Sequence, residues 1–206
     1  IWGKRINTSM AEIIEGILEK TGGKERSIRW FRQKVKELGE VPSAQLVREG
    51  FVTGRPTLGT MNFFMYDPKY KNNKQVLPYY DMFPLVLPIQ PVGGGDINEG
   101  FVGLNFHYLS IPMRLKLLNI IQEYATNDRM DETTRIRLTW NRIKRNPIVK
   151  PVVKRYLADH VRGTFRRIDA EEMMVAVLLP VQRFVRARET QVYADSRRII
   201  NQPRRV

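Results

Sequence analysis

The strongest constraint on the fold is a change in the spacing of apolar residues along the chain. Residues 100–109, GFVGLNFHYL, alternate between large apolar and small or polar side chains, which predicts a β-strand. Residues 59–66 and 83–89 are further strand candidates. The prolines around the second predict that it lies at a sheet edge, because proline cannot donate a ladder hydrogen bond. The sequence therefore predicts an α+β protein with a small antiparallel sheet in residues 59–109.

On both sides of this block, apolar residues recur every three or four positions, which predicts helices. Residues 1–50 form an N-terminal helical segment in this interpretation. Residues 51–206 form the main α+β domain, and the pattern also fits a single domain. The C-terminal half is predicted to be basic, helical and packed on the sheet. Its helices are expected from residue 111 onward and at residues 131–145, 153–161, 173–179 and 190–200.

Positive charge is concentrated in the C-terminal half. The chain has 35 Lys+Arg and 21 Asp+Glu, which gives a net charge of +14. Residues 114–167 and 183–206 together supply the whole of this excess. An excess of this size on a folded domain indicates a polyanionic partner, because each Lys or Arg that meets a phosphate releases condensed counterions.

The basic residues gain a defined geometry on the helix predicted at 131–145. Ile136, Trp140 and Ile143 form its buried stripe, and cations flank that stripe on both sides. Most of the basic residues are arginines, whose planar guanidinium suits phosphate. The sequence shows no recognition helix or RNA-binding signature, so we expect contacts with the backbone of double-stranded DNA rather than with base edges. The candidate DNA-binding residues are Arg135, Arg137, Arg142, Lys144, Arg145, Lys154, Arg155, Arg162, Arg166, Arg167, Arg197 and Arg198.

A second group of polar residues lies in and near the predicted strands. Asn105 and His107 share one face of the alternating segment, and a short polar run precedes it. We interpret these side chains as a hydrogen-bonded structural network rather than a catalytic site. The expected members are Tyr79, Tyr80, Asp81, Asn105 and His107.

The residues that usually carry catalysis are scarce. The chain has no cysteine and only two histidines, so we expect no cofactor, no metal site and no enzymatic activity. A divergent metal-dependent nuclease is the enzymatic alternative, with Asp67, Asp81, Asp96 and Glu99 as its available carboxylates. The most apolar window, residues 173–181, is far shorter than the ~20 residues of a membrane span, so no membrane association is expected.

Several separate blocks of sequence resemble one family. The chain is similar to the DNA end-protector family of T-even-like contractile-tailed phages. The blocks, which keep the order of the family, are FFMYDPKYK at 63–71, LPYYDMFPLVLPI at 77–89, EGFVGLNFHYLSIPMRLKLL at 99–118, VKRYLADHVRGTFRRIDAEE at 153–172, LLPVQRF at 178–184 and YADSRRII at 193–200.

The resemblance implies a virion structural protein that acts late in head completion and is assembled in the host cytoplasm. It implies binding to the ends of the packaged genome, protection of these ends from host exonuclease, and contact with portal, neck or tail proteins. It carries over no catalytic residue and no metal ligand. Homo-oligomerisation in the particle stays open. A neck, tail or baseplate adaptor that docks its basic face on acidic protein stays open as well.

Overall fold

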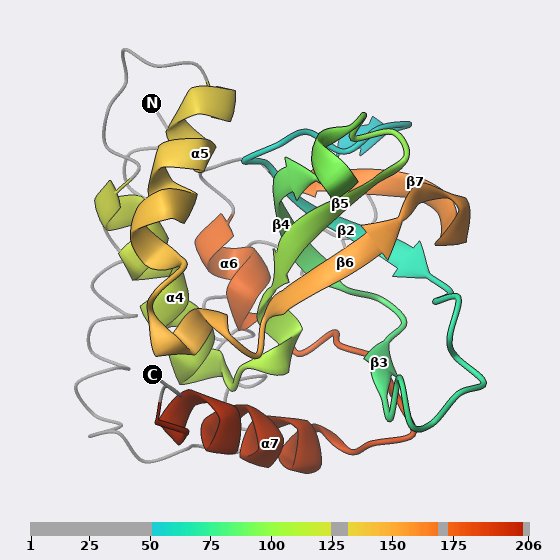
Figure 1. Cartoon of the computed structure of the whole chain (residues 1–206), viewed down its shortest axis with the longest axis vertical. Coiled ribbons are helices and arrows are strands. Elements are labelled where there is room, and N and C mark those ends of the chain that lie inside the picture. Colours follow the sequence, from blue (N-terminus) through green and yellow to red (C-terminus); the bar gives the residue numbers. More distant parts are fainter. Residues whose placement is uncertain (1–50, 125–131, 169–172, 204–206) are drawn as a thin grey trace.

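A computed structural model describes residues 51–124, 132–168 and 173–203 of the protein (Figure 1). The N-terminal helical segment predicted for residues 1–50 lies outside these ranges. Within them, helices accompany antiparallel sheets, which confirms the α+β class. No helix among the described residues is long and apolar enough to cross a membrane.

The main sheet draws its strands from both halves of the sequence. Its six strands lie in the order β1-β7-β2-β4-β5-β6, and every neighbouring pair is antiparallel. The prediction of a sheet confined to residues 59–109 was therefore too narrow. The strands are β1 (Phe51–Thr53), β2 (Met61–Tyr66), β4 (Leu85–Pro91), β5 (Gly100–Asn105), β6 (Val153–Leu157) and β7 (Val161–Ile168). A second sheet pairs β3 (Tyr80–Asp81) with β8 (Phe184–Val185).

The helix predicted at residues 153–161 is wrong. These residues form β6, a short 3-10 turn (Ala158–His160) and the start of β7. Along β6, Gly103 pairs with Lys154 and Phe101 pairs with Tyr156. Tyr156 is buried against the rings of Phe64 and Phe101. Packing of this ring on the sheet outweighs a local spacing of apolar residues that also fits a helix.

The predicted edge position of residues 83–89 is also wrong, because β4 lies between β2 and β5. Proline is tolerated there at an irregularity. The pairing register between β4 and β5 shifts between Pro88 and Gln90, so the missing N–H of Pro88 falls at this shift. Gly103 of β5 makes the close approach possible, since a Cβ there would lie 2.4 Å from Cγ1 of Val86.

The main sheet curls around an aromatic core. The rings of Phe101 on β5 and Phe165 on β7 lie 6.2 Å apart, although β2 and β4 separate these strands in the sheet order. Phe64 on β2 contacts both rings. Strong curvature therefore brings the two ends of the sheet toward each other around a small buried cluster.

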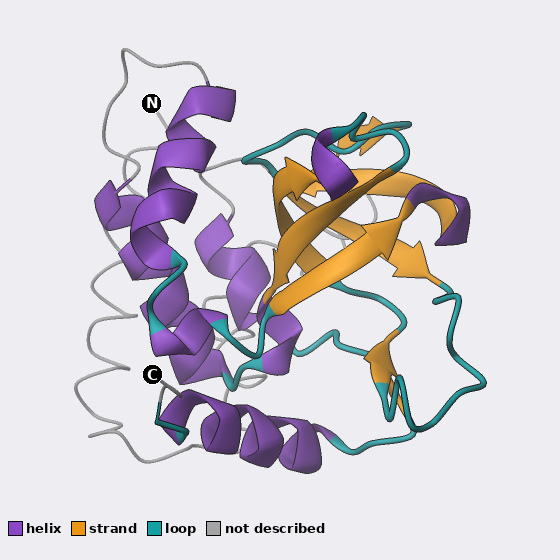
Figure 2. Cartoon of the chain, in the orientation of Figure 1, coloured by secondary structure: helices purple, strands orange, loops and turns teal. Residues whose placement is uncertain are grey.

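The helices gather along one side of the main sheet (Figure 2). They are α4 (Ile111–Tyr124), α5 (Glu132–Ile143), α6 (Met173–Leu178) and α7 (Glu189–Asn201). These elements confirm the helices predicted from residue 111 onward, at 131–145 and at 190–200. Between them and the sheet lies the larger hydrophobic core, to which Phe63, Leu87, Leu118 and Val192 belong.

Candidate nucleic-acid interface

The predicted cations of α5 line a solvent-facing helix. Ile136 and Ile143 are buried in the core, whereas Arg137 and Arg142 are exposed. Lys144 and Arg145 directly follow the helix and are also exposed. Arg135, the remaining candidate in this segment, is half-buried. Burial of one stripe thus fixes the helix and leaves its cations on the other faces.

A second set of predicted cations lies on strands rather than on a helix. Arg155 on β6 and Arg162 on β7 are exposed, and Lys154 is half-buried. The guanidinium of Arg162 donates to Asp67 at 3.3 Å. Two further candidates, Arg166 and Arg167, are half-buried on β7, where their backbone pairs with both β1 and β2.

The remaining candidates, Arg197 and Arg198, are exposed on α7. Arg198 pairs with Asp195 one turn earlier at 3.3 Å. The twelve predicted residues are therefore divided among α5 with its following turn, strands β6 and β7, and α7. This replaces the expected set of C-terminal helices with a mixed surface of helices and strands.

The chain supplies further exposed cations that the prediction did not include. Lys69, Lys71 and Lys74 lie on the loop between β2 and β3, and Arg183 and Arg186 flank β8. The N–H of Arg186 donates to the carbonyl of Leu77 at 2.6 Å, so the two segments are joined. The pairing of β3 with β8 and this hydrogen bond place the segment around Arg186 beside the end of the loop that carries the lysines.

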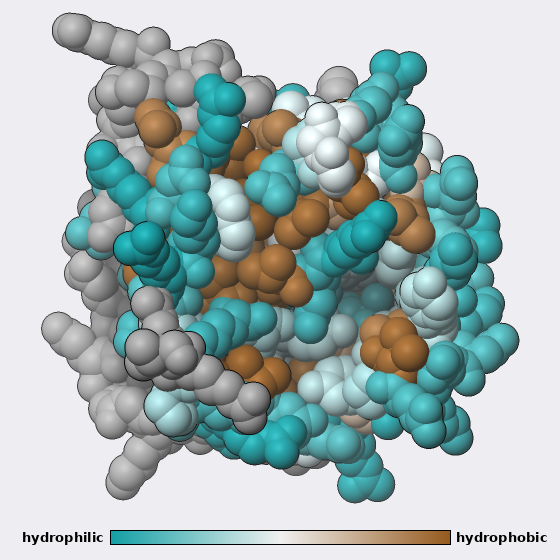
Figure 3. Space-filling view, in the orientation of Figure 1, coloured by the Kyte–Doolittle hydropathy of each residue, from teal (hydrophilic) through white to brown (hydrophobic). Residues whose placement is uncertain are grey.

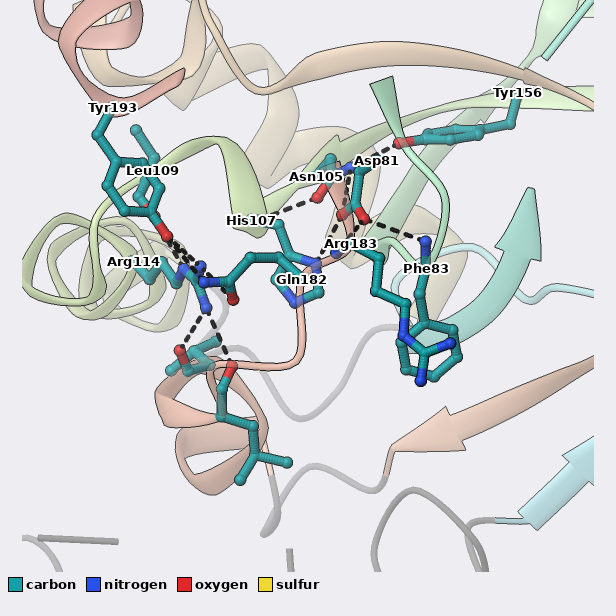
Figure 4. Close-up of polar contacts among 12 residues, drawn as sticks. Asp81, Phe83, Asn105, His107, Leu109, Arg114, Tyr156, Gln182, Arg183 and Tyr193 are labelled. Carbon is teal, nitrogen blue, oxygen red and sulfur yellow. Dashed lines mark hydrogen bonds and ion pairs between the residues drawn. The ribbon is translucent and has the colours of Figure 1, made fainter. Parts of the chain in front are cut away.

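Three members of the predicted polar network meet in the interior (Figure 4). Nδ1 of His107 lies 2.6 Å from Oδ2 of Asp81, and Nδ2 of Asn105 lies 3.5 Å from the same oxygen. Oδ1 of Asp81 accepts backbone N–H bonds from Phe83 and Arg183 at 3.0 Å each. The buried carboxylate thus links β3, the end of β5 and the segment before β8.

The end of β5 depends on the same network. Oδ1 of Asn105 accepts the backbone N–H of His107 at 3.0 Å, and a 3-10 turn (Phe106–Tyr108) begins there. The strand is therefore shorter than the ten alternating residues predicted, because the Asn105 side chain caps the turn. The amide of Asn105 also donates to the hydroxyl of Tyr156 at 3.0 Å.

The other two predicted members lie elsewhere. The Tyr79 hydroxyl donates to Asp195 of α7 at 3.3 Å. The guanidinium carbon of Arg186 lies 5.7 Å from the centre of the Tyr80 ring. The carboxylates considered for a nuclease are also separated: Asp67 pairs with Lys71, and Asp96 bonds to Asn98. Within the described residues, no three His, Asp or Glu side chains are grouped so that they could hold a metal ion.

Burial and hydrogen bonding set the charges of the Asp81–His107 pair. Burial would raise the pKa of Asp81, but His107 and two backbone N–H groups together hold that pKa below its usual value. Burial lowers the pKa of His107, against the opposing effect of Asp81. Nε2 of His107 is buried without a hydrogen-bond partner among the described residues. A neutral imidazole that donates from Nδ1 to the carboxylate fits this environment, since an imidazolium would leave a charged N–H unsatisfied.

The neutral state of His107 predicts a loss of stability in mild acid. In the unfolded chain His107 titrates near 6.5, and its pKa in the folded protein is lower, so its stabilising contribution is complete above pH 6.5. As the pH falls below 6.5, the free energy of unfolding should fall by up to about 1.4 kcal/mol per pH unit. Asp81, with its own lowered pKa, adds a further loss below about pH 3.8. Urea unfolding between pH 5 and 7.5 measures the first effect.

The two histidines of the chain provide a matched control for this measurement. His107→Gln should remove most of the dependence between pH 5 and 6.5, whereas His160→Gln should keep it, because His160 bonds to a backbone carbonyl outside the network. Equal pH profiles for the wild-type protein and His107→Gln would contradict a neutral buried His107.

Arg114 forms a second buried polar centre, which the sequence did not indicate (Figure 4). Its side chain is fully buried in α4 and donates to three backbone carbonyls, those of Leu109, Val177 and Leu179, at 2.8–3.3 Å. It also donates at 3.0 Å to Gln182 and to the Tyr193 hydroxyl of α7. One guanidinium therefore joins α4, the end of α6 and α7.

The protein combines a curled antiparallel sheet with a layer of helices, and both carry exposed cations. Such a basic α+β protein has a surface charge suited to contact with a polyanion. The sequence matches the model of the phage T4 terminal DNA protecting protein family over residues 5–201. The chain belongs to this family, which confirms the resemblance read from its sequence blocks. Comparison with curated proteins and with solved structures gave no match.

Proposed function

We propose that the protein is a virion structural protein that binds the ends of packaged double-stranded phage DNA and protects them from exonuclease. Membership of the terminal DNA protecting protein family over nearly the whole chain is the observation that carries this proposal. The net charge of +14 supports it, because a protein that binds ends of any sequence must draw its affinity from the phosphate backbone.

The twelve candidate cations are the proposed phosphate contacts. Arg137, Arg142 and Arg145 are exposed on and after α5, and Arg155 is exposed on β6. Guanidinium groups on rigid helices and strands can bind phosphate oxygens with little loss of conformational freedom. At the end of head completion, portal, neck or tail proteins would be the neighbours of a protein at the genome end, and we include them among its proposed partners.

A protection assay tests the proposal. Linear duplex DNA incubated with the protein should survive a processive double-strand exonuclease, and the protein concentration that gives half-protection defines the effect. The triple variant Arg137→Gln, Arg142→Gln, Arg145→Gln should need at least about 10-fold more protein, because each lost phosphate contact weakens binding to every sequence.

A second triple variant removes the same charge elsewhere. Lys116, Lys150 and Arg188 are exposed basic residues outside the candidate set, and their replacement by Gln should change half-protection much less. Equal loss in both triple variants would show that net charge alone binds DNA. If the first triple variant protected DNA as well as the wild-type protein does, these three residues would not be phosphate contacts. Docking of this surface on another protein would then be favoured.

A further inference from the structure

A cavity of about 310 Å³ lies beside β6 and is lined by tyrosines. The loop between β2 and β3 forms its opposite wall, and Figure 3 shows the hollowed surface between these elements. Its tyrosines are Tyr66, Tyr70, Tyr80, Tyr108 and Tyr156, and its cations are Lys69, Lys154 and Arg155. The volume is at the small end of ligand sites, so one nucleotide could enter but not a duplex.

Hydrogen bonds hold the inner tyrosines in place. The Tyr66 hydroxyl accepts the backbone N–H of Leu157 at 3.1 Å, and the Tyr156 hydroxyl accepts the amide of Asn105 at 3.0 Å. The two rings meet edge to face with centroids 4.9 Å apart. Each hydroxyl accepts one bond and keeps its own O–H as a donor, so the two residues form a fixed inner wall of the cavity.

Lys154 places a positive charge in this aromatic setting. Its Nζ lies 3.9 Å from the centre of the Tyr108 ring, and it forms no ion pair with any described residue. Burial lowers the pKa of Lys154 to about 8, so the ammonium group is still charged at neutral pH. Asp81 also lines the cavity, but its carboxylate is bonded to His107 and to two backbone N–H groups and forms no ion pair with Lys154. A phosphate beside Lys154 would give the ammonium group a counter-charge of its own.

The mouth of the cavity is unusually apolar for an exposed surface. Four large hydrophobic side chains are exposed among the described residues, and two of them, Tyr70 and Val76, line this mouth. Their side chains are 53% and 60% exposed. An exposed ring beside cations is the arrangement that stacks a base of single-stranded nucleic acid.

We propose that this cavity binds the unstacked terminal nucleotide of a DNA strand, with its phosphate at Lys154 and its base against the tyrosines. The assignment rests on the proposed function and explains why the protein would prefer DNA ends to the duplex interior. An internal nucleotide must be unpaired and unstacked before it can enter a cavity, whereas a single-stranded terminal nucleotide needs neither step. The cavity thus distinguishes a DNA end from the duplex interior without reading its sequence.

Two DNA ligands of equal duplex length and sequence test the proposal. One has open ends with short single-stranded overhangs, and the other is a dumbbell whose ends are closed by hairpin loops. Stacking on an aromatic side chain contributes about 1–3 kcal/mol per base, which corresponds to roughly 5- to 150-fold in affinity. The wild-type protein should therefore bind the open ligand at least about 5-fold more tightly than the dumbbell.

The variants Tyr70→Ala and Lys154→Met should each bring this affinity ratio close to one. Tyr70 is outside the candidate phosphate contacts, so Tyr70→Ala should also leave dumbbell binding within about 2-fold. Leu138→Ala and Lys116→Met are matched controls outside the cavity, and both should keep the wild-type ratio. Emission from 2-aminopurine at the terminal position should change on binding to the wild-type protein and not to Tyr70→Ala. Methionine replaces an ammonium that burial disfavours, so Lys154→Met should stay folded, which thermal unfolding verifies.

A ratio of one for the wild-type protein, or an unchanged ratio in both cavity variants, would overturn the proposal. Failure of the proposed function gives a different result, because the dumbbell itself would then bind weakly and without dependence on salt. Salt-dependent dumbbell binding without preference for the open ligand, together with protection of linear DNA from exonuclease, would keep the proposed function and reject the cavity as an end site.

Discussion

Replacing Arg114 with methionine is expected to lower the free energy of unfolding by about 4 kcal/mol or more. The guanidinium satisfies three buried carbonyls, the Gln182 side chain and the Tyr193 hydroxyl. Methionine fills similar space but donates nothing, and each buried acceptor left without a partner costs about 1–3 kcal/mol. Since a domain is stable by only about 5–15 kcal/mol, this loss should bring the protein close to unfolding.

Urea unfolding of Arg114→Met measures this loss against Lys116→Met, the matched control two residues along the same helix. Lys116 is exposed, so its replacement should change stability by less than about 0.5 kcal/mol. Arg114→Lys keeps the charge but has three donors instead of five, and should lie between the wild-type protein and Arg114→Met. Equal stability of all three proteins would show that the buried guanidinium is not needed to join α4 to α7.

The affinity for double-stranded DNA should fall about 10³- to 10⁴-fold between 50 and 200 mM monovalent salt. This expectation assumes that six to eight of the twelve candidate cations contact phosphates at once, because each contact releases condensed counterions. Titration of the hairpin-closed dumbbell at several salt concentrations gives the slope without any contribution from free ends.

The slope of log affinity against log salt concentration also separates the candidate residues from other charges. The triple variant Arg137→Gln, Arg142→Gln, Arg145→Gln should reduce its magnitude by about three, whereas the control variant with Lys116, Lys150 and Arg188 replaced should reduce it by less than one. An affinity that does not change with salt would reject phosphate contacts as the basis of binding. The basic surface would then be better explained by docking on an acidic protein.

Most helices could be predicted from the sequence because their buried stripes are long and regular. Ile136, Trp140 and Ile143 define α5 clearly, and the structure buries Ile136 and Ile143 as expected. Residues 153–161 failed because Val153, Tyr156 and Leu157 fit both a helix and an edge strand. Only the pairing of β6 with β5, which depends on residues some fifty positions earlier, decides between the two.

The candidate site was predictable in its charge but not in its shape. The excess of Lys and Arg can be counted in the sequence, yet a linear pattern does not show that Lys154, Arg155, Arg162, Arg166 and Arg167 lie on strands. Asp81, Asn105 and His107 were grouped correctly by their polarity within an apolar block. The sequence did not indicate Arg114, because a single arginine in an apolar helical segment is ordinarily expected to be exposed. It did not indicate the tyrosine cavity either, because the rings of the cavity come from β2, β3, β6 and two connecting segments.

The position of β7 between β1 and β2 has a consequence for synthesis on the ribosome. The strand that closes the sheet is made about a hundred residues after the strand it completes, so the N-terminal strands must wait for it with unpaired edges. Arg162, Arg166 and Arg167 arrive on that same strand. A nascent chain therefore completes its main sheet and gains this part of its positive surface with the same strand, and a chain that stops before β7 gains neither.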